Sequence, residues 1–233
     1  MEKGTVHNKE SFLSTIADKL GRDRRTDVTL PEWKHQPQWK VYQEATSYEL
    51  AAIFRKNSEE KDAFVVETDQ SMLSETLQRV MKEYGGGPIV TTKDARFAAY
   101  GLTSALDNND THIWETTVGE INIEKAKGAN IGVIFSDMTL AESGTVVQFN
   151  DKDIARSVCL LPMTYIAIVP KSSIVPRMTQ ATHKIHKQVA AGEDIATNIN
   201  FMSGPSNSAD IEMDIVVGVH GPVKAVYIVV SDR

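Results

Sequence analysis

The stretch IGVIFSDMTLAESGTVVQFN (131–150) decides the fold class, because one apolar strand pattern runs there into a second with no helix between them. Upstream of it, strand and helix patterns alternate. AFVVE (63–67) precedes an amphipathic helix, PIV (88–90) precedes a weaker helix around 95–102, and THIWE (111–115) precedes a third. This alternation predicts a largely parallel sheet covered by helices.

Downstream of Phe135 the alternation stops. Three apolar segments follow one another without an amphipathic helix between them: GTVVQF (144–149), SVCLL (157–161) and TYIAIV (164–169). We interpret all three as strands and expect a mixed sheet or a second small sheet in this region. Helical spacing returns at 178–189, before strand patterns at 197–202 and 224–230. The predicted fold class is therefore α/β, with a mixed, largely parallel sheet flanked by helices.

The start of the chain is predicted to lie outside the sheet domain. A short amphipathic helix is expected between Asn8 and Gly21, and the proline-containing segment after it favours an extended chain. Thr46 and Glu49 then have the spacing of a capping box, which marks the first helix of the domain. We divide the chain into an N-terminal helix and extended arm, 1–45, and an α/β domain, 46–233.

Composition excludes several classes of protein. The chain has 233 residues, 41% of them hydrophobic, and a formal charge of −6, so it lacks the basic excess that nucleic-acid binding requires. A single cysteine, Cys159, cannot form a disulfide or ligate an iron–sulfur cluster alone, and its apolar neighbours predict a buried thiol. We expect a cytoplasmic protein, because no secretory signal and no membrane-spanning apolar run is present.

The first candidate site is AESGT (141–145), within the stretch that follows the strand pattern at 131–135. Glu142 is a candidate base, nucleophile or hydrogen-bond acceptor. Gly144 would allow a ligand close to the backbone, and the hydroxyls of Ser143 and Thr145 could hold an oxyanion. An ordinary β-turn, in which these hydroxyls bond their own backbone, is the alternative.

Two loops near the carboxyl terminus complete the predicted site, and a small anionic ligand is the expected occupant. SGPSNSADIE (203–212) offers amides and hydroxyls that could bind a carboxylate or phosphate, and GVHGP (218–222) precedes the last strand. Arg156 is the cation that we expect to bind the anion through its guanidinium group. The alternative is that Arg156 forms an ordinary surface salt bridge. The remaining candidates in these loops are Gly204, Ser206, Ser208, Asp210, Glu212, His220 and Gly221. The acidic residues alternate along a strand pattern, and we expect a solvated face there rather than a cation site with His220.

Several of these segments together resemble the lactate-utilisation protein C family, whose members carry a LUD domain. The resemblance covers about residues 60–233 and rests on FSDMTLAESGTVV, RSVCLLP, TNINFMSGPSNSADIE and GVHGP. It implies a fold similar to the NagB, RpiA and CoA-transferase group. It also implies a part in bacterial L-lactate oxidation to pyruvate beside cysteine-rich iron–sulfur partners, with no cofactor on this chain.

Two other functions stay open at this stage. One is an enzyme of the CoA-transferase or isomerase type that acts on a small anionic substrate through Glu142, since Glu-x-Gly is similar to the motif that carries the CoA-transferase glutamate. The other is a ligand-sensing regulator, which would bind a small molecule without converting it.

Overall fold

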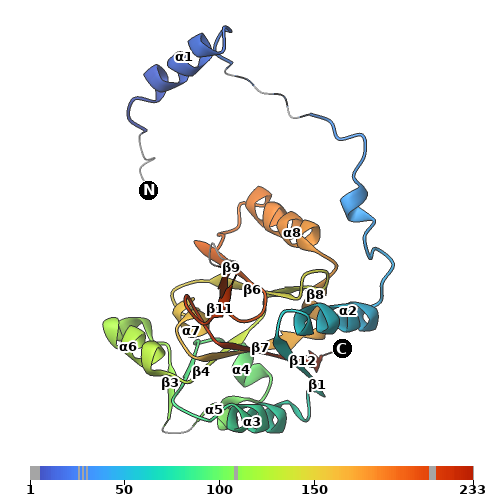
Figure 1. Cartoon of the computed structure of the whole chain (residues 1–233), viewed down its shortest axis with the longest axis vertical. Coiled ribbons are helices and arrows are strands. Elements are labelled where there is room, and N and C mark those ends of the chain that lie inside the picture. The colour runs from blue at the N-terminus through green and yellow to red at the C-terminus, as the bar shows by residue number, and fades with distance from the viewer. Residues whose placement is uncertain are drawn as a thin grey trace. The chain divides into compact units, whose positions relative to one another are not determined.

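The computed structural model describes residues 6–25, 27, 29, 31–107, 110–209 and 214–232 (Figure 1). These residues divide into two compact units, 1–36 and 37–233. The first unit contains the helix α1 (Lys9–Lys19). The second contains all of the strands and the remaining helices. No described helix is long and apolar enough to cross a membrane.

The second unit is built on a six-stranded sheet in which every neighbouring pair is parallel. The strand order is β1-β12-β7-β4-β2-β3. The strands are β1 (Ala63–Asp69), β2 (Ile89–Thr91), β3 (Thr111–Ile113), β4 (Ile131–Phe135), β7 (Thr164–Pro170) and β12 (Lys224–Ser231). The central strands β4 and β7 are buried along their whole length, as expected of a parallel sheet covered on both faces. The predicted α/β fold class is confirmed.

The expected second sheet is also present. It has the order β8-β5-β6-β9, and a separate hairpin pairs β10 with β11. The strands are β5 (Met138–Leu140), β6 (Thr145–Asn150), β8 (Ile174–Val175), β9 (Asn198–Met202), β10 (Asn207–Ala209) and β11 (Ile215–Val217). Because β5 begins three residues after β4 ends, the stretch 131–150 passes directly from one sheet to the other.

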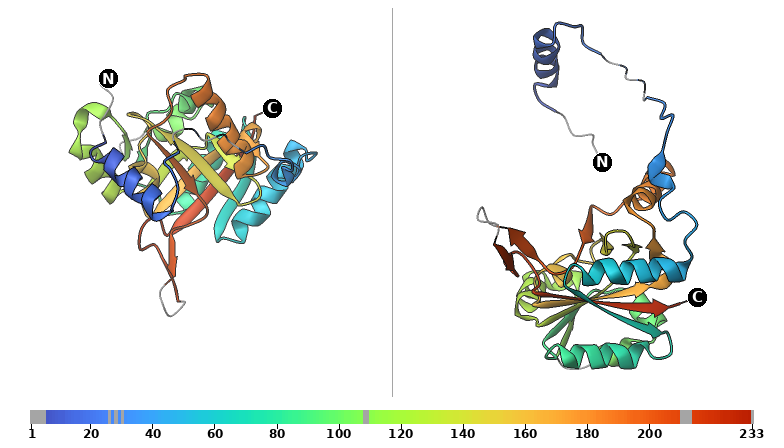
Figure 2. Two further views of the ribbon diagram at one scale, coloured as in Figure 1. Left: turned by 90° about the horizontal axis from the view of Figure 1, so that it is seen from above. Right: turned by 45° about the vertical axis from the view of Figure 1, so that its right-hand side comes forward.

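Helices cover both faces of the six-stranded sheet. On one face, α2 (Ser47–Glu59), α6 (Glu120–Gly128) and α7 (Ser157–Leu160) contribute to the larger apolar cluster. On the other face, α3 (Leu73–Glu83), α4 (Arg96–Ala99) and α5 (Thr103–Leu106) form the second cluster. Figure 2 (right) shows the sheet nearly edge-on, with α2 and α3 on opposite sides. The last helix, α8 (Met178–Ala190), packs on the small sheet through Ala181.

Short 3-10 helices join several of these elements. They are η1 (Pro37–Trp39), η2 (Thr116–Val118) and η3 (Lys171–Ser173). The predicted capping box at the start of α2 is confirmed, since Glu49 N donates to Thr46 Oγ1 at 3.2 Å and Thr46 N donates to Glu49 Oε2 at 2.7 Å. Asn8 precedes α1, but its side chain makes no capping hydrogen bond.

Two local predictions were wrong. SVCLL forms the one-turn helix α7 instead of a strand, because Val158 and Cys159 bury their side chains against the sheet from a helical turn, and periodicity cannot distinguish the two in so short an apolar run. The helix expected around 95–102 is shorter than predicted, since α4 covers only Arg96–Ala99 and a second one-turn helix, α5, begins at Thr103. Gly101, with φ of 71°, breaks the helix between them.

Gly132 in β4 allows α7 to pack directly on the sheet. A Cβ atom added at this position would lie 1.9 Å from the Val158 carbonyl oxygen. The strand cannot move away, because β4 is hydrogen-bonded to β2 on one side and β7 on the other. The contact therefore requires a residue without a side chain.

We predict that Gly132→Ala lowers the free energy of unfolding by about 1–3 kcal/mol, the usual cost of an overpacked core. Urea unfolding followed by circular dichroism measures the change. Gly128→Ala is the matched control, because nothing lies within 4 Å of a Cβ added there. Equal stability of the two variants would contradict the close approach of α7 to β4.

Candidate functional site

The strand order places a topological switch point between β2 and β4. The chain leaves β2 towards β3 on one side, whereas it leaves β4 towards β7 on the other. The two connections therefore diverge at the carboxyl ends of these adjacent strands. In open α/β sheets, ligands bind in the crevice that such a divergence creates.

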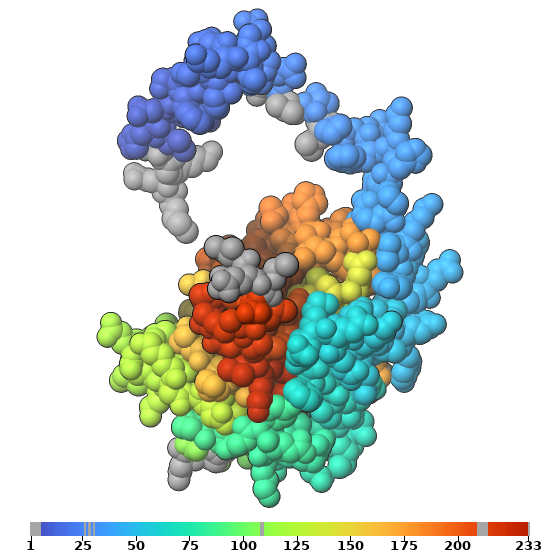
Figure 3. Space-filling view, in the orientation of Figure 1, coloured from blue at the N-terminus to red at the C-terminus, as the bar shows by residue number. Residues whose placement is uncertain are grey.

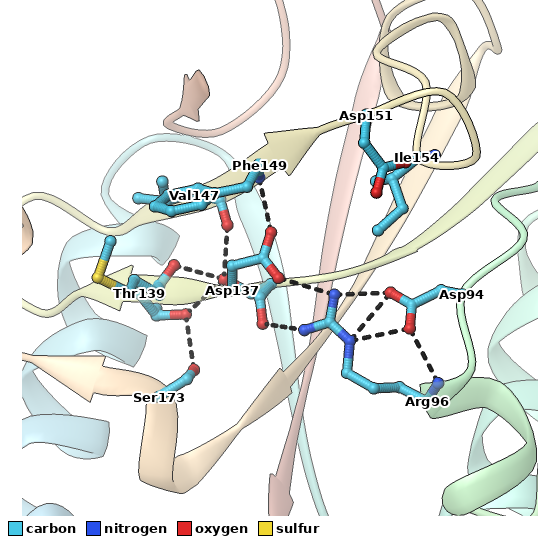
Figure 4. A network of polar contacts seen from close by, with 11 residues as sticks. Asp94, Arg96, Asp137, Thr139, Val147, Phe149, Asp151, Ile154 and Ser173 are labelled. Atoms are coloured by element: carbon cyan, nitrogen blue, oxygen red, sulfur yellow. Dashed lines mark hydrogen bonds and ion pairs between the residues drawn. The ribbon is translucent and has the colours of Figure 1, made fainter. Parts of the chain in front are cut away.

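One arginine spans this switch point (Figure 4). Arg96, at the start of α4, binds Asp94 in the loop after β2, with 3.0 Å and 2.9 Å from its Nε to the two carboxylate oxygens. On the other side its Nη2 lies 2.8 Å from Asp137 Oδ1, and its Nη1 donates to the Ser136 carbonyl oxygen at 3.1 Å. The guanidinium also lies 5.0 Å from the centre of the Phe135 ring. A single side chain thus joins the loops after β2 and β4.

The charges of this network are largely removed from water. The side chains of Asp94, Arg96 and Asp137 are 6%, 29% and 23% exposed. Burial raises the pKa of the Asp137 carboxyl, although the nearby Arg96 guanidinium and the Phe149 amide, which donates at 2.6 Å, oppose this shift. Burial lowers the pKa of Arg96, but hydrogen bonds and attraction to the two aspartates more than compensate and raise it. A paired, buried carboxylate beside a crevice is typical of a functional site.

Hydroxyl groups extend the network to the next strand connection. Ser136 Oγ and Thr139 Oγ1 are 2.8 Å apart, and Thr139 Oγ1 and Ser173 Oγ are 3.3 Å apart (Figure 4). The loops after β2, β4 and β7 are therefore linked at one edge of the sheet by polar side chains. Such an edge is a pre-organised place for a small ligand.

The predicted AESGT site lies elsewhere, at the turn between β5 and β6. The hydroxyls of Ser143, Thr145 and Ser203 form a chain with oxygen–oxygen distances of 2.7 Å and 2.6 Å, so this turn does meet the SGPS loop. A Cβ atom on Gly144 would lie 2.8 Å from the Ser58 amide nitrogen of α2. The close approach that Gly144 permits is therefore to the last turn of α2.

Both the side chain and the backbone of Glu142 make polar contacts within the protein. Its carboxylate lies 2.8 Å from Arg177 Nε and is 37% exposed. The side-chain amide of Asn57 donates to its carbonyl oxygen at 3.0 Å. The role of Glu142 as base or nucleophile stays a prediction, and in this conformation its carboxylate is neutralised by an arginine.

The SGPS loop is held by a buried pair of tyrosines. Tyr227 Oη accepts from the Gly204 amide at 2.8 Å and lies 2.6 Å from Tyr165 Oη. A Cβ atom on Gly204 would lie 2.4 Å from the Lys61 carbonyl oxygen, just beyond α2. In the space-filling view, the surface of the carboxyl-terminal segment (red) lies beside that of α2 (blue-green) (Figure 3).

The third predicted segment adjoins the second. The Ser206 amide donates to the Pro222 carbonyl oxygen at 2.8 Å, and a Cβ atom on Gly221 would lie 3.2 Å from Ser206 Cβ. His220 is exposed. This region lies at the amino end of the sheet, since Val223, just before β12, bonds the Met163 carbonyl oxygen just before β7. The predicted segments thus come together, but away from the switch point.

The other predicted residues are dispersed. Arg156 is exposed at the start of α7, and Ser208 lies on β10. Asp210 and Glu212 lie outside the described residues. Among the residues that are described, no group of three or more His, Cys, Asp or Glu side chains is arranged to hold a metal ion.

Sequence reasoning missed the switch-point residues Asp94, Arg96 and Asp137. A signal was present, because TTKDAR (91–96) places polar and charged residues directly after a strand pattern. The position of that strand beside β4 was not predictable from local patterns, and it alone brings Asp94 and Asp137 together.

Cys159 lies in a buried polar environment between α7 and the small sheet. Its Sγ is 3.2 Å from Gln148 Oε1, and the Asn200 side-chain amide is 4.0 Å away. Burial raises the pKa of the Cys159 thiol to about 12. The thiol is therefore protonated at physiological pH, which makes it a poor nucleophile and a poor metal ligand.

Comparisons with known proteins agree with this fold. The sequence profile of the LUD domain matches residues 51–230. Lactate utilization protein C of Bacillus subtilis (strain 168) is 53% identical over 240 residues, and that of Geobacillus sp. (strain WCH70) is 52% identical, each with 100% of both chains covered. A crystal structure of a DUF162 family protein from Deinococcus radiodurans has a TM-score of 0.58 at 14% identity, covering 80% of this chain and 99% of that one.

We predict that Cys159 in the folded chain reacts with N-ethylmaleimide at pH 8 at least about a hundredfold more slowly than in the urea-unfolded chain, since both burial and the raised pKa suppress the thiolate. Mass spectrometry of samples quenched over time measures both rates. Rapid labelling of a chain that remains folded would contradict the buried, protonated thiol.

Proposed function

This chain belongs to the LUD domain family, and we propose that it acts in bacterial lactate utilization as a non-redox component of a system that oxidises L-lactate to pyruvate. The observation that carries the proposal is the likeness to proteins named lactate utilization protein C, at about half identity along the whole of both chains. Likeness over the full length supports a shared role more strongly than a shared fold does.

The chemistry of the chain supports the non-redox part of this proposal. Oxidation of lactate to pyruvate releases a pair of electrons, which an acceptor must take up. Iron–sulfur clusters are commonly held by four cysteine thiolates, and this chain has one cysteine, which is buried and protonated. We therefore assign the electron-transfer step to cysteine-rich iron–sulfur partner proteins.

The proposal is tested in a bacterium from which the gene for its own relative of this chain has been deleted. We predict that this chain restores growth on L-lactate as sole carbon source. Cys159→Ala should restore growth equally well, because in this account the thiol carries no electrons. Growth rate on L-lactate, with growth on glucose as the control, is the measurement.

Two outcomes would overturn different parts of the proposal. No restoration by the native chain, although it accumulates as folded protein, would refute the role in lactate utilization. Loss of growth with Cys159→Ala would refute the non-redox assignment, provided that the thermal unfolding midpoint of this variant stays within a few degrees of the native value.

A further inference from the structure

The strand β1 leaves one edge of the six-stranded sheet open. It lies at the end of the strand order and pairs only with β12, in a parallel register that runs from Ala63↔Ala225 to Asp69↔Ser231. In the part of the chain that the structure describes, no backbone group of 63–69 bonds to a backbone group outside this ladder. An edge strand of this kind presents a row of unpaired amides and carbonyls to which another strand can bond.

This edge lacks the usual protection against such pairing. β1 has seven residues, whereas the opposite edge strand β3 has three, and the edge strands of the small sheet, β8 and β9, have two and five. Proteins also block their edges with lysine or proline, and β1 contains neither. Its first half, AFVV (63–66), is entirely apolar. In Figure 2 (right), β1 (blue-green) passes between α2 and α3.

A hollow of about 470 Å³ lies along the first half of this edge. One wall is aromatic, because the rings of Phe64 and Tyr84 meet edge to face with their centres 5.8 Å apart. Phe64 is 56% exposed, although large aromatic rings are usually covered. The rest of the apolar lining consists of Ala63, Val65, Val66, Val80 and Val226. The hollow therefore offers apolar surface directly beside unpaired backbone groups.

The rim of the hollow is negatively charged. The helix α2 ends at Glu59 and α3 ends at Glu83, and both residues line the hollow, so two helix carboxyl termini add their partial negative charge. Glu83 is paired with Arg79, but the exposed carboxylates of Glu59 and Asp62 form no ion pair with any described residue. The ammonium of Lys224 lies 5.4 Å from the centre of the Tyr84 ring and offsets only part of this charge.

We propose that the open edge of β1 is a docking site for an extended, basic segment of a partner protein, which adds to the sheet as a further strand. Main-chain hydrogen bonds to β1 give this mode of recognition its affinity, and side chains in the adjoining hollow give its specificity. A lysine or arginine of the segment lies against Glu59 and Asp62, with the apolar stem of its side chain along the Phe64 ring. The proposal does not depend on the role in lactate utilization, because it rests on the surface around β1 alone.

A second copy of this chain suits the edge less well than a basic segment does. The charged residues of β1, Glu67 and Asp69, and the residue before the strand, Asp62, are all acidic. Glu67 is neutralised by Arg55, with 2.8 Å between Nη2 and Oε1, but the others have no basic partner among the described residues. Two copies of the strand would therefore bring like charges together, which destabilises a strand pair.

The test uses the full-length chain and three synthetic peptides. The basic peptide, acetyl-TKVRVKT-amide, alternates positive and apolar side chains, and acetyl-TEVEVET-amide reverses its charges. The third peptide has the basic sequence with methyl groups on its central amide nitrogens, which removes the main-chain donors. Fluorescence anisotropy of the labelled peptides at low ionic strength measures each affinity. Two-dimensional NMR of the ¹⁵N-labelled chain locates the binding site.

The basic peptide should shift the amides of residues 62–68 saturably. It should bind about tenfold more tightly than the acidic peptide, because it gains exposed ion pairs where the acidic peptide meets like charges. It should also bind at least about tenfold more tightly than the methylated peptide, which cannot donate the main-chain hydrogen bonds of an added strand.

A pair of double variants separates the rim of the hollow from the overall charge of the chain. Glu59→Gln with Asp62→Asn should weaken binding of the basic peptide about fivefold. Asparagine suits position 62, because Asp62 has a φ of 59° and asparagine tolerates this conformation. Glu120→Gln with Glu193→Gln removes the same charge from exposed positions elsewhere and should leave the affinity unchanged.

Several outcomes would overturn the proposal. These are no saturable binding of the basic peptide, shifts centred away from β1, equal affinity for any two of the three peptides, and native affinity in the variant at positions 59 and 62. Sedimentation of the chain alone tests the other occupant. A monomer is expected, and a dimer that Phe64→Ala dissociates would assign the edge to a second copy instead.

Discussion

The carboxyl edge of the sheet depends on the position of one guanidinium group between two carboxylates. Arg96 binds Asp94 on the β2 side and Asp137 on the β4 side, and all three side chains are largely buried. Removal of the arginine would leave two buried carboxylates in close proximity, and breaking such a pair costs about 3–5 kcal/mol. The loops after β2 and β4 therefore keep a fixed separation.

The two ends of the sheet are built differently. At the amino end, the glycine- and serine-rich loops bond to one another and pack on α2, and the tyrosine pair holds them over the sheet. At the carboxyl end, the charged side chain of Arg96 joins the loops after β2 and β4. The segments with the most distinctive sequence thus make extensive contacts within the protein.

Local patterns predicted much of the fold. The capping box at Thr46, the alternation of strands and helices, and the second sheet after Phe135 all depend on neighbours in the chain, and all are present. The one-turn helix at Cys159 was missed because a four-residue element has too few positions to show a period. The pairing of Arg96 with Asp137 was missed because 41 positions separate them and only the strand order joins them.

The central claim is that Arg96 and Asp137 hold the switch point together, and a double-mutant cycle tests it most directly. The free energies of unfolding of Arg96→Gln, Asp137→Asn and the double variant are measured in urea against the native chain. We predict a coupling energy of about 1–3 kcal/mol between the two positions, as for groups in one buried network. Additive effects, within about 0.5 kcal/mol, would mean that the two side chains do not interact and would contradict the account.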